Sequence, residues 1–151
     1  MERKEVPRLF FTEAEQKRIA QAIEEAERKT SAEIVVRLER NCPGNPLERC
    51  RELLNSLGIT STAGRTGLII LITVEDHKVA VFGDEAIDKE IHQEGWQDIC
   101  DHLVSELKNG EAFDGMIHAI QALGDRLSTC FPCKAGDINE LPNQPSYSDE
   151  H

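Results

Sequence analysis

One uninterrupted apolar stretch, residues 67–74 (GLIILITV), constrains the fold more than any other part of the chain. The stretch has about the length of one strand and is rich in β-branched residues, so both of its faces should be buried, as in a central strand. A polar turn, residues 75–78, follows it, and then a second short apolar run, residues 79–82. The two runs predict a β-hairpin around which the rest of the chain is built.

The part of the chain before this hairpin predicts a helix, a strand and a second helix. A capping box that begins at Thr12 starts a helix over residues 13–29, with apolar side chains at helical spacing. Residues 33–39 (EIVVRLE) alternate in polarity, which predicts a strand with one wetter face. Asn45 is a good cap for the next helix, over residues 46–57, which has proline at its first position.

Strand, helix and buried strand in this order form a βαβ unit. The crossover of such a unit is right-handed in almost all proteins, so strand 33–39 should lie parallel to strand 67–74. After the hairpin, apolar spacing predicts three helices, over residues 87–91, 96–107 and 116–130. The predicted fold class is therefore α/β: a three-layer α/β/α sandwich with a small mixed sheet, made of the βαβ unit and an antiparallel hairpin strand, between flanking helices.

Length and composition complete this description. The chain of 151 residues predicts one domain, residues 10–131, followed by residues 132–151 as an acidic, proline-containing tail without periodicity that we expect to be disordered. The formal charge of −11 disfavours nucleic acid as a partner, because phosphate contacts need clustered Lys and Arg. We see neither a signal peptide nor the ~20 consecutive apolar residues of a transmembrane helix. The odd number of cysteines, five, fits a reducing compartment. We therefore predict a cytoplasmic protein.

Cys130 and Cys133 form a C-x-x-C that follows a predicted helix end. Reactive dithiols usually lie at a helix start, where the helix dipole lowers the thiol pKa, and no nearby cysteine or histidine pair completes a zinc site. The segment is therefore predicted to be a helix terminus with Phe131 against the core.

Four segments of the sequence carry a family resemblance: residues 30–36 (TSAEIVV), 66–72 (TGLIILI), 76–87 (DHKVAVFGDEAI) and 110–115 (GEAFDG). Together they resemble the TPM domain family, over roughly residues 10–131. That family includes a thylakoid lumen protein described as an acid phosphatase and many bacterial proteins of unknown role. The resemblance implies an α/β sandwich with helices on both sides of a small mixed sheet. It also implies that acidic residues near strand ends bind calcium or magnesium, as in some relatives.

The predicted topology brings several acidic residues to one edge of the sheet, namely the end at which the first two strands begin and the third strand finishes. Because the third strand runs antiparallel to the other two, Glu33 and Asp84 fall on the same edge. Asp84, Glu85 and Asp88 begin a helix, and the i, i+4 spacing of Asp84 and Asp88 puts both carboxylates on one helix face. These four residues are the predicted ligands of Ca²⁺ or Mg²⁺. The competing interpretation is that Asp84 caps the helix and its neighbours complement the helix dipole.

A phosphatase would also need an anion-binding group, and Arg65 and Thr66 lie at this same edge. Because the acidic cluster repels anions, phosphate would bind only through the metal. We therefore expect a TPM-like accessory domain that binds a divalent cation, with weak metal-assisted acid phosphatase activity and with neither an assigned catalytic residue nor an organic cofactor. The alternative is a non-catalytic protein–protein interaction module that presents its helical face or a sheet edge, guarded by Arg37 and Glu39, to a protein partner. The sequence predicts no oligomeric state.

Overall fold

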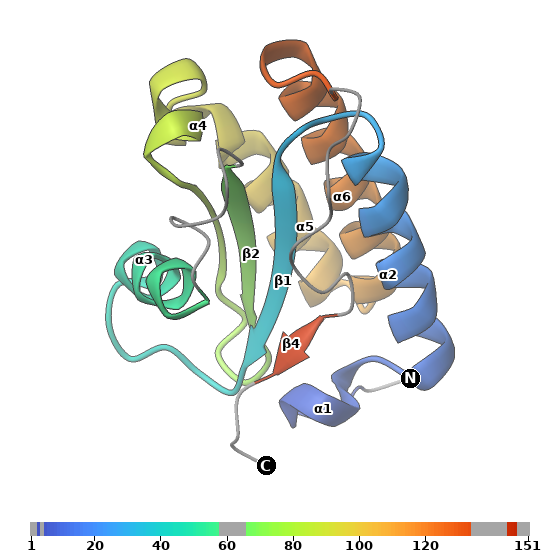
Figure 1. The fold of residues 1–151 in the computed structure, drawn as a ribbon. Helices are drawn as coiled ribbons and strands as arrows, with labels where there is room; N and C mark the ends of the chain where they lie inside the picture. Colours follow the sequence, from blue (N-terminus) through green and yellow to red (C-terminus); the bar gives the residue numbers. More distant parts are fainter. Residues whose placement is uncertain (1–2, 4, 58–65, 134–144, 148–151) are drawn as a thin grey trace.

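A computed structural model describes residue 3 and residues 5–57, 66–133 and 145–147 of the protein (Figure 1). Its elements, in chain order, are α1 (Pro7–Phe10), α2 (Glu13–Glu27), β1 (Glu33–Glu39), α3 (Pro46–Ser56), β2 (Gly67–Thr73), β3 (Val79–Gly83), α4 (Glu85–Glu90), the 3-10 helix η2 (Gln93–Trp96), α5 (Gln97–Lys108), α6 (Ala112–Cys130) and β4 (Ser146–Tyr147).

The sheet is mixed, with the strand order β3-β2-β1-β4. β1 lies parallel to β2, with Glu33 opposite Gly67, and β3 lies antiparallel to β2, with Phe82 opposite Ile69. Every residue of β2 is buried, as its continuous apolar sequence predicts for a central strand. The predicted α/β class, the βαβ unit and the hairpin are confirmed.

Helices cover both faces of the sheet, unequally (Figure 1). α2, α5 and α6 pack on one face, and the larger core lies between them and the side chains of Ile34, Val36, Leu38, Leu68, Ile70 and Ile72. Among the described helices, α3 alone packs on the other face, where a smaller core contains Val35, Cys50, Leu53, Leu54, Ile69, Leu71 and Ala80. Beside β3, the described elements leave a pocket on this second face, which is where the candidate site lies.

Two predicted helix starts are confirmed in atomic detail. The Thr12 side chain accepts a hydrogen bond from the Glu15 amide, and the Glu15 carboxylate accepts one from the Thr12 amide, which completes the capping box. At the start of α3, the Asn45 side chain accepts a hydrogen bond from the Leu47 amide at 2.9 Å. Both starts depend on residues within three positions of each other, so the sequence alone is sufficient to predict them.

The face of β1 that was expected to be wetter is instead buried, and Val35 on this face packs against α3. Glu33 is 0 % exposed and Val35 is 3 % exposed, and Glu39, at 6 %, is nearly as inaccessible. The charge of Glu39 is tolerated there because Arg37 and Arg49 both donate hydrogen bonds to its carboxylate.

A short strand lies within the segment that was expected to be a disordered tail. Ser146 and Tyr147 form β4, which pairs in parallel with Arg37 and Leu38 of β1, and Pro145 beside them is buried. The prediction of disorder is therefore wrong for residues 145–147, whereas residues 134–144 and 148–151 lie outside the described part of the chain. A strand of two residues is too short to show an alternating pattern, so periodicity could not reveal it.

Candidate functional site

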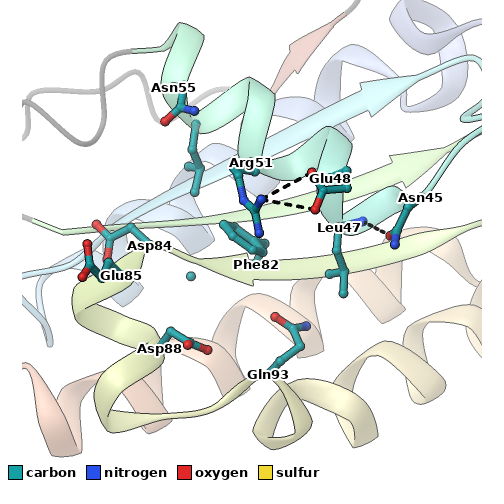
Figure 2. A pocket seen from close by; sticks show the side chains of 12 residues that line it. Asn45, Leu47, Glu48, Arg51, Asn55, Phe82, Asp84, Glu85, Asp88 and Gln93 are labelled. Atoms are coloured by element: carbon teal, nitrogen blue, oxygen red, sulfur yellow. Dashed lines mark hydrogen bonds and ion pairs between the residues drawn. The ribbon is translucent and has the colours of Figure 1, made fainter.

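A pocket of about 590 Å³ opens between α3, β3 and α4 (Figure 2). Leu47, Leu54 and Phe82 are the large apolar side chains of its lining. The polar side chains come from α3 and its cap on one side and from α4, its cap and η2 on the other: Asn45, Glu48, Arg51, Asn55, Asp84, Glu85, Asp88 and Gln93. The pocket thus combines an apolar base with charged groups of both signs.

The α3 wall follows from the way this helix packs. Its apolar residues face the sheet, so Glu48, Arg51 and Asn55, spaced by three and four positions, share a face directed toward β3 (Figure 2). The Arg51 guanidinium lies over the Phe82 ring, 5.9 Å from its centroid, and pairs with Glu48 at 3.3 Å. Because both charged side chains are more than half exposed, this ion pair is weak and leaves Arg51 available to a ligand.

Asp84 connects the opposite wall to the centre of the sheet. One carboxylate oxygen accepts hydrogen bonds from the Ile87 amide at 3.1 Å and from the Thr66 hydroxyl, and the other accepts one from the Gly67 amide at 2.8 Å. The capping interpretation of Asp84 is therefore confirmed, and the same side chain fastens α4 to the start of β2. Gly83 is required directly before it, because a Cβ there would lie 2.8 Å from the Ile87 Cβ.

Glu85 and Asp88 stand on the first turn of α4 and are exposed. Glu85 lies 3.9 Å from Lys89, and its side chain is 88 % exposed, so this pair holds it only loosely. Within the described residues, no side chain forms a hydrogen bond or ion pair with the Asp88 carboxylate. Both carboxylates are therefore free to rotate toward the pocket mouth.

Glu33 reaches the predicted edge of the sheet but not the pocket. It is opposite Gly67 in the ladder, and the Gly67 carbonyl accepts the Asp84 amide hydrogen bond at 2.9 Å, so the predicted common edge is correct. Glu33 is nevertheless fully buried and is absent from the pocket lining, whereas Asp84, Glu85 and Asp88 all line it. In the part of the chain that the structure describes, no group of three or more His, Cys, Asp or Glu side chains is arranged to hold a metal ion.

The two predicted anion-binding residues have different outcomes. Arg65 lies outside the described residues. Thr66 is buried at 7 % exposure, and its hydroxyl donates to Asp84, so it positions that carboxylate. Sequence reasoning missed Arg51 and Gln93 as pocket residues, although the shared helix face of Glu48 and Arg51 was a signal that could have indicated a polar wall.

Comparisons with known proteins agree with the fold. A family model described as the TPM domain matches residues 7–126. The chain is similar to the BA42 protein from the psychrophilic bacterium Bizionia argentinensis, whose structure was solved by NMR: the two are 32 % identical, with a TM-score of 0.83, over 92 % of this chain and 96 % of that chain.

A more distant similarity shows the fold alone. The N-terminal domain of a protein from P. gingivalis, also solved by NMR, is 14 % identical with a TM-score of 0.66, over 80 % of this chain and 78 % of that one. No curated protein matches the chain. Among the described helices, none combines the length and apolar character that crossing a membrane requires.

Proposed function

The chain belongs to the TPM domain family, and we propose that it is an accessory domain that holds a divalent cation, Ca²⁺ or Mg²⁺, at the mouth of the pocket between α3, β3 and α4. The observation that supports the proposal is that Asp84, Glu85 and Asp88 line one pocket from one short segment. Glu48 adds a fourth carboxylate from the opposite side (Figure 2). Hard divalent cations prefer such carboxylate oxygens, completed by water.

The proposed ligand set differs from the one expected from the sequence. Glu33 is left out because it is buried away from the pocket. Asp84 contributes only the oxygen that faces Gly67, because its other oxygen already accepts two hydrogen bonds. Glu85 and Asp88 would supply most of the binding, and an open site of this kind predicts a dissociation constant of about 10⁻⁴ to 10⁻³ M.

The finer form of the proposal is weak, metal-assisted hydrolysis of phosphomonoesters. A cation at the acidic rim would remove the repulsion between the carboxylates and an anionic ligand. Arg51 on the facing wall would then contact the phosphate oxygens, and a water on the cation would be the nucleophile. The exposed Arg51 guanidinium in the pocket lining is the observation that favours a phosphorylated ligand.

Thermal unfolding tests the cation. With a dissociation constant of 1 mM, 10 mM Ca²⁺ would stabilise the native state by about 1.4 kcal/mol and raise Tm by about 3 to 5 °C. The doubly substituted Glu85→Gln/Asp88→Asn protein should lose this rise. The Glu90→Gln variant, altered on the same helix outside the pocket lining, should keep it. An equal rise in all three proteins, or none in the unaltered protein, contradicts the proposal.

Hydrolysis needs its own experiment. Turnover of p-nitrophenyl phosphate should require Mg²⁺ or Ca²⁺ and should fall at least about tenfold in Arg51→Met, since a charged hydrogen bond to the ligand is lost. Arg28→Met, which removes an exposed arginine directly after α2, is the control. Activity that is unchanged by Arg51→Met and by chelation would place the reaction outside this pocket.

The second candidate function is a non-catalytic module that binds a protein partner. One observation favours it: an edge of the sheet already accepts an added strand, β4. A cytoplasmic location stays a prediction.

A further inference from the structure

The two edges of the sheet are protected in different ways. On β3, the Val81 carbonyl faces away from β2 and accepts a hydrogen bond from the Gln93 side chain at 2.7 Å. On β1, the Ile34 amide donates to the Glu27 carboxylate at 2.9 Å. Side chains of the protein's own helices thus block β3 and the beginning of β1 against strand addition.

Along the remaining part of the β1 edge, residues 36–38, the strand that pairs with β1 among the described residues is β4 of the C-terminal segment (Figure 1). Arg37 pairs with Ser146, Leu38 pairs with Tyr147, and the Ser146 hydroxyl lies 3.4 Å from the Val36 carbonyl, which is long for a hydroxyl donor. β4 has two residues. This part of the edge can therefore bind an extended segment, and its present occupant is short.

Arg37 is held in an orientation that lets it donate a hydrogen bond to the backbone of such a segment. Its guanidinium donates to the Tyr147 carbonyl at 3.0 Å and also donates twice to Glu39, at 3.0 and 3.1 Å. Arg49 fixes Glu39 in turn, through hydrogen bonds of 2.6 and 3.0 Å. Burial by itself would raise the pKa of Glu39, but the hydrogen bonds from Arg49 and Arg37 outweigh it and hold the pKa below its usual value. The carboxylate is thus charged at neutral pH and keeps Arg37 directed at the added strand.

The side chains of the segment give the site its selectivity. Pro145 is buried, and Tyr147 is partly buried and packs against the larger core cluster. Ser146 between them is small and hydroxylated. A main-chain carbonyl bound to Arg37 carries no sequence information, so proline at the first position and an aromatic ring at the third are the features that this edge would recognise.

We propose that residues 36–38 of β1 form a strand-addition site for a partner peptide that carries proline, a small hydroxylated residue and an aromatic residue in succession. The chain's own residues 145–147 are the internal occupant, which such a peptide must displace. This inference rests on the second candidate function, protein binding, and is independent of the cation pocket. Because the internal segment is tethered, at an effective concentration on the order of millimolar, it should weaken binding of a partner peptide at least about tenfold.

The test uses the full chain and a labelled peptide with the sequence of residues 141–151 (LPNQPSYSDEH). Ser146→Pro in the chain should release the internal segment, because proline cannot donate a ladder hydrogen bond. The variant should bind the peptide at least about tenfold more tightly than the unaltered chain does. Asn139→Pro, a proline placed in the tail outside β4, should behave like the unaltered chain.

Further measurements keep the test decisive. Arg37→Met added to Ser146→Pro should weaken peptide binding, and a peptide with its own Ser146→Pro change should not bind. On the unaltered chain, excess unlabelled peptide at millimolar concentration should displace the internal segment and shift the amide resonances of Ser146 and Tyr147. The proposal is overturned if the Leu38 amide exchanges rapidly in Ser146→Pro and the peptide still binds no better. It is equally overturned if that amide stays protected in the variant, or if no resonance of the unaltered chain moves.

Discussion

Removal of the Asp84 carboxylate should destabilise the fold far more than removal of the carboxylate four residues later. Asp84→Ala deletes a helix cap, worth about 1 kcal/mol. It also leaves the Gly67 amide and the Thr66 hydroxyl without their charged acceptor, at about 1.5 to 3 kcal/mol for a hydrogen bond to a charged group. We expect a loss of about 3 kcal/mol in the free energy of unfolding. The exposed Asp88→Ala should lose no more than about 0.5 kcal/mol.

Urea unfolding at neutral pH, with a chelator present so that no cation contributes, measures both variants. Asp84→Asn adds a finer comparison, because asparagine still caps the helix through its carbonyl oxygen but turns an amide donor toward the Gly67 donor. It should therefore fall between the unaltered protein and Asp84→Ala. If Asp84→Ala and Asp88→Ala have the same unfolding free energy, Asp84 does not join α4 to the sheet and our description of this wall is wrong.

Three further predictions follow from packing, linkage and burial. Gly83→Ala should lower the unfolding free energy by about 1 to 3 kcal/mol, because its Cβ would overlap the side chain one turn on, while Gly44→Ala, with open space around its Cα, should change it little in the same urea assay. The depressed pKa of Glu39 contributes stability that is present above the usual glutamate pKa and is lost as the pH falls through the lower, folded-state value. Glu39→Gln should therefore flatten the acid side of the stability profile, and an unchanged slope would refute this linkage. Burial raises the pKa of the Cys50 thiol to about 12, so mass spectrometry after iodoacetamide treatment at pH 8 should find it unmodified while both exposed thiols of the C-x-x-C segment are alkylated.

The features that the sequence could predict are those encoded by neighbouring residues or by chain topology. The apolar run of β2, the capping box at Thr12 and the turn that follows β2 are local patterns. The placement of Glu33 and Asp84 at one end of the sheet is not local. It follows from the parallel pairing of β1 with β2 and from the hairpin of β2 and β3, which together decide which strand ends meet.

The features that could not be predicted depend on distant packing. Glu33 and Val35 alternate with the inward residues of β1, a pattern that suggests a solvated face, yet both are buried, Val35 against α3. Arg37 was expected to repel an added strand, and it instead donates a hydrogen bond to Tyr147, which is 110 residues away in the sequence. Arg51 was not assigned to a site, because only the folded chain places α3 beside β3. Each case requires knowledge of which distant segment packs against which strand, and periodicity does not contain this information.

Backbone amide NMR during titration with Ca²⁺ tests the proposed function most directly. We expect saturable shifts at millimolar ion that are largest for the first turn of α4, residues 84–88, with smaller shifts for Arg51 and Phe82 across the pocket, and we expect Glu85→Gln/Asp88→Asn to abolish them. If these amides do not move at 10 mM Ca²⁺ or Mg²⁺, or if the shifts persist in the double variant, the pocket does not hold the cation.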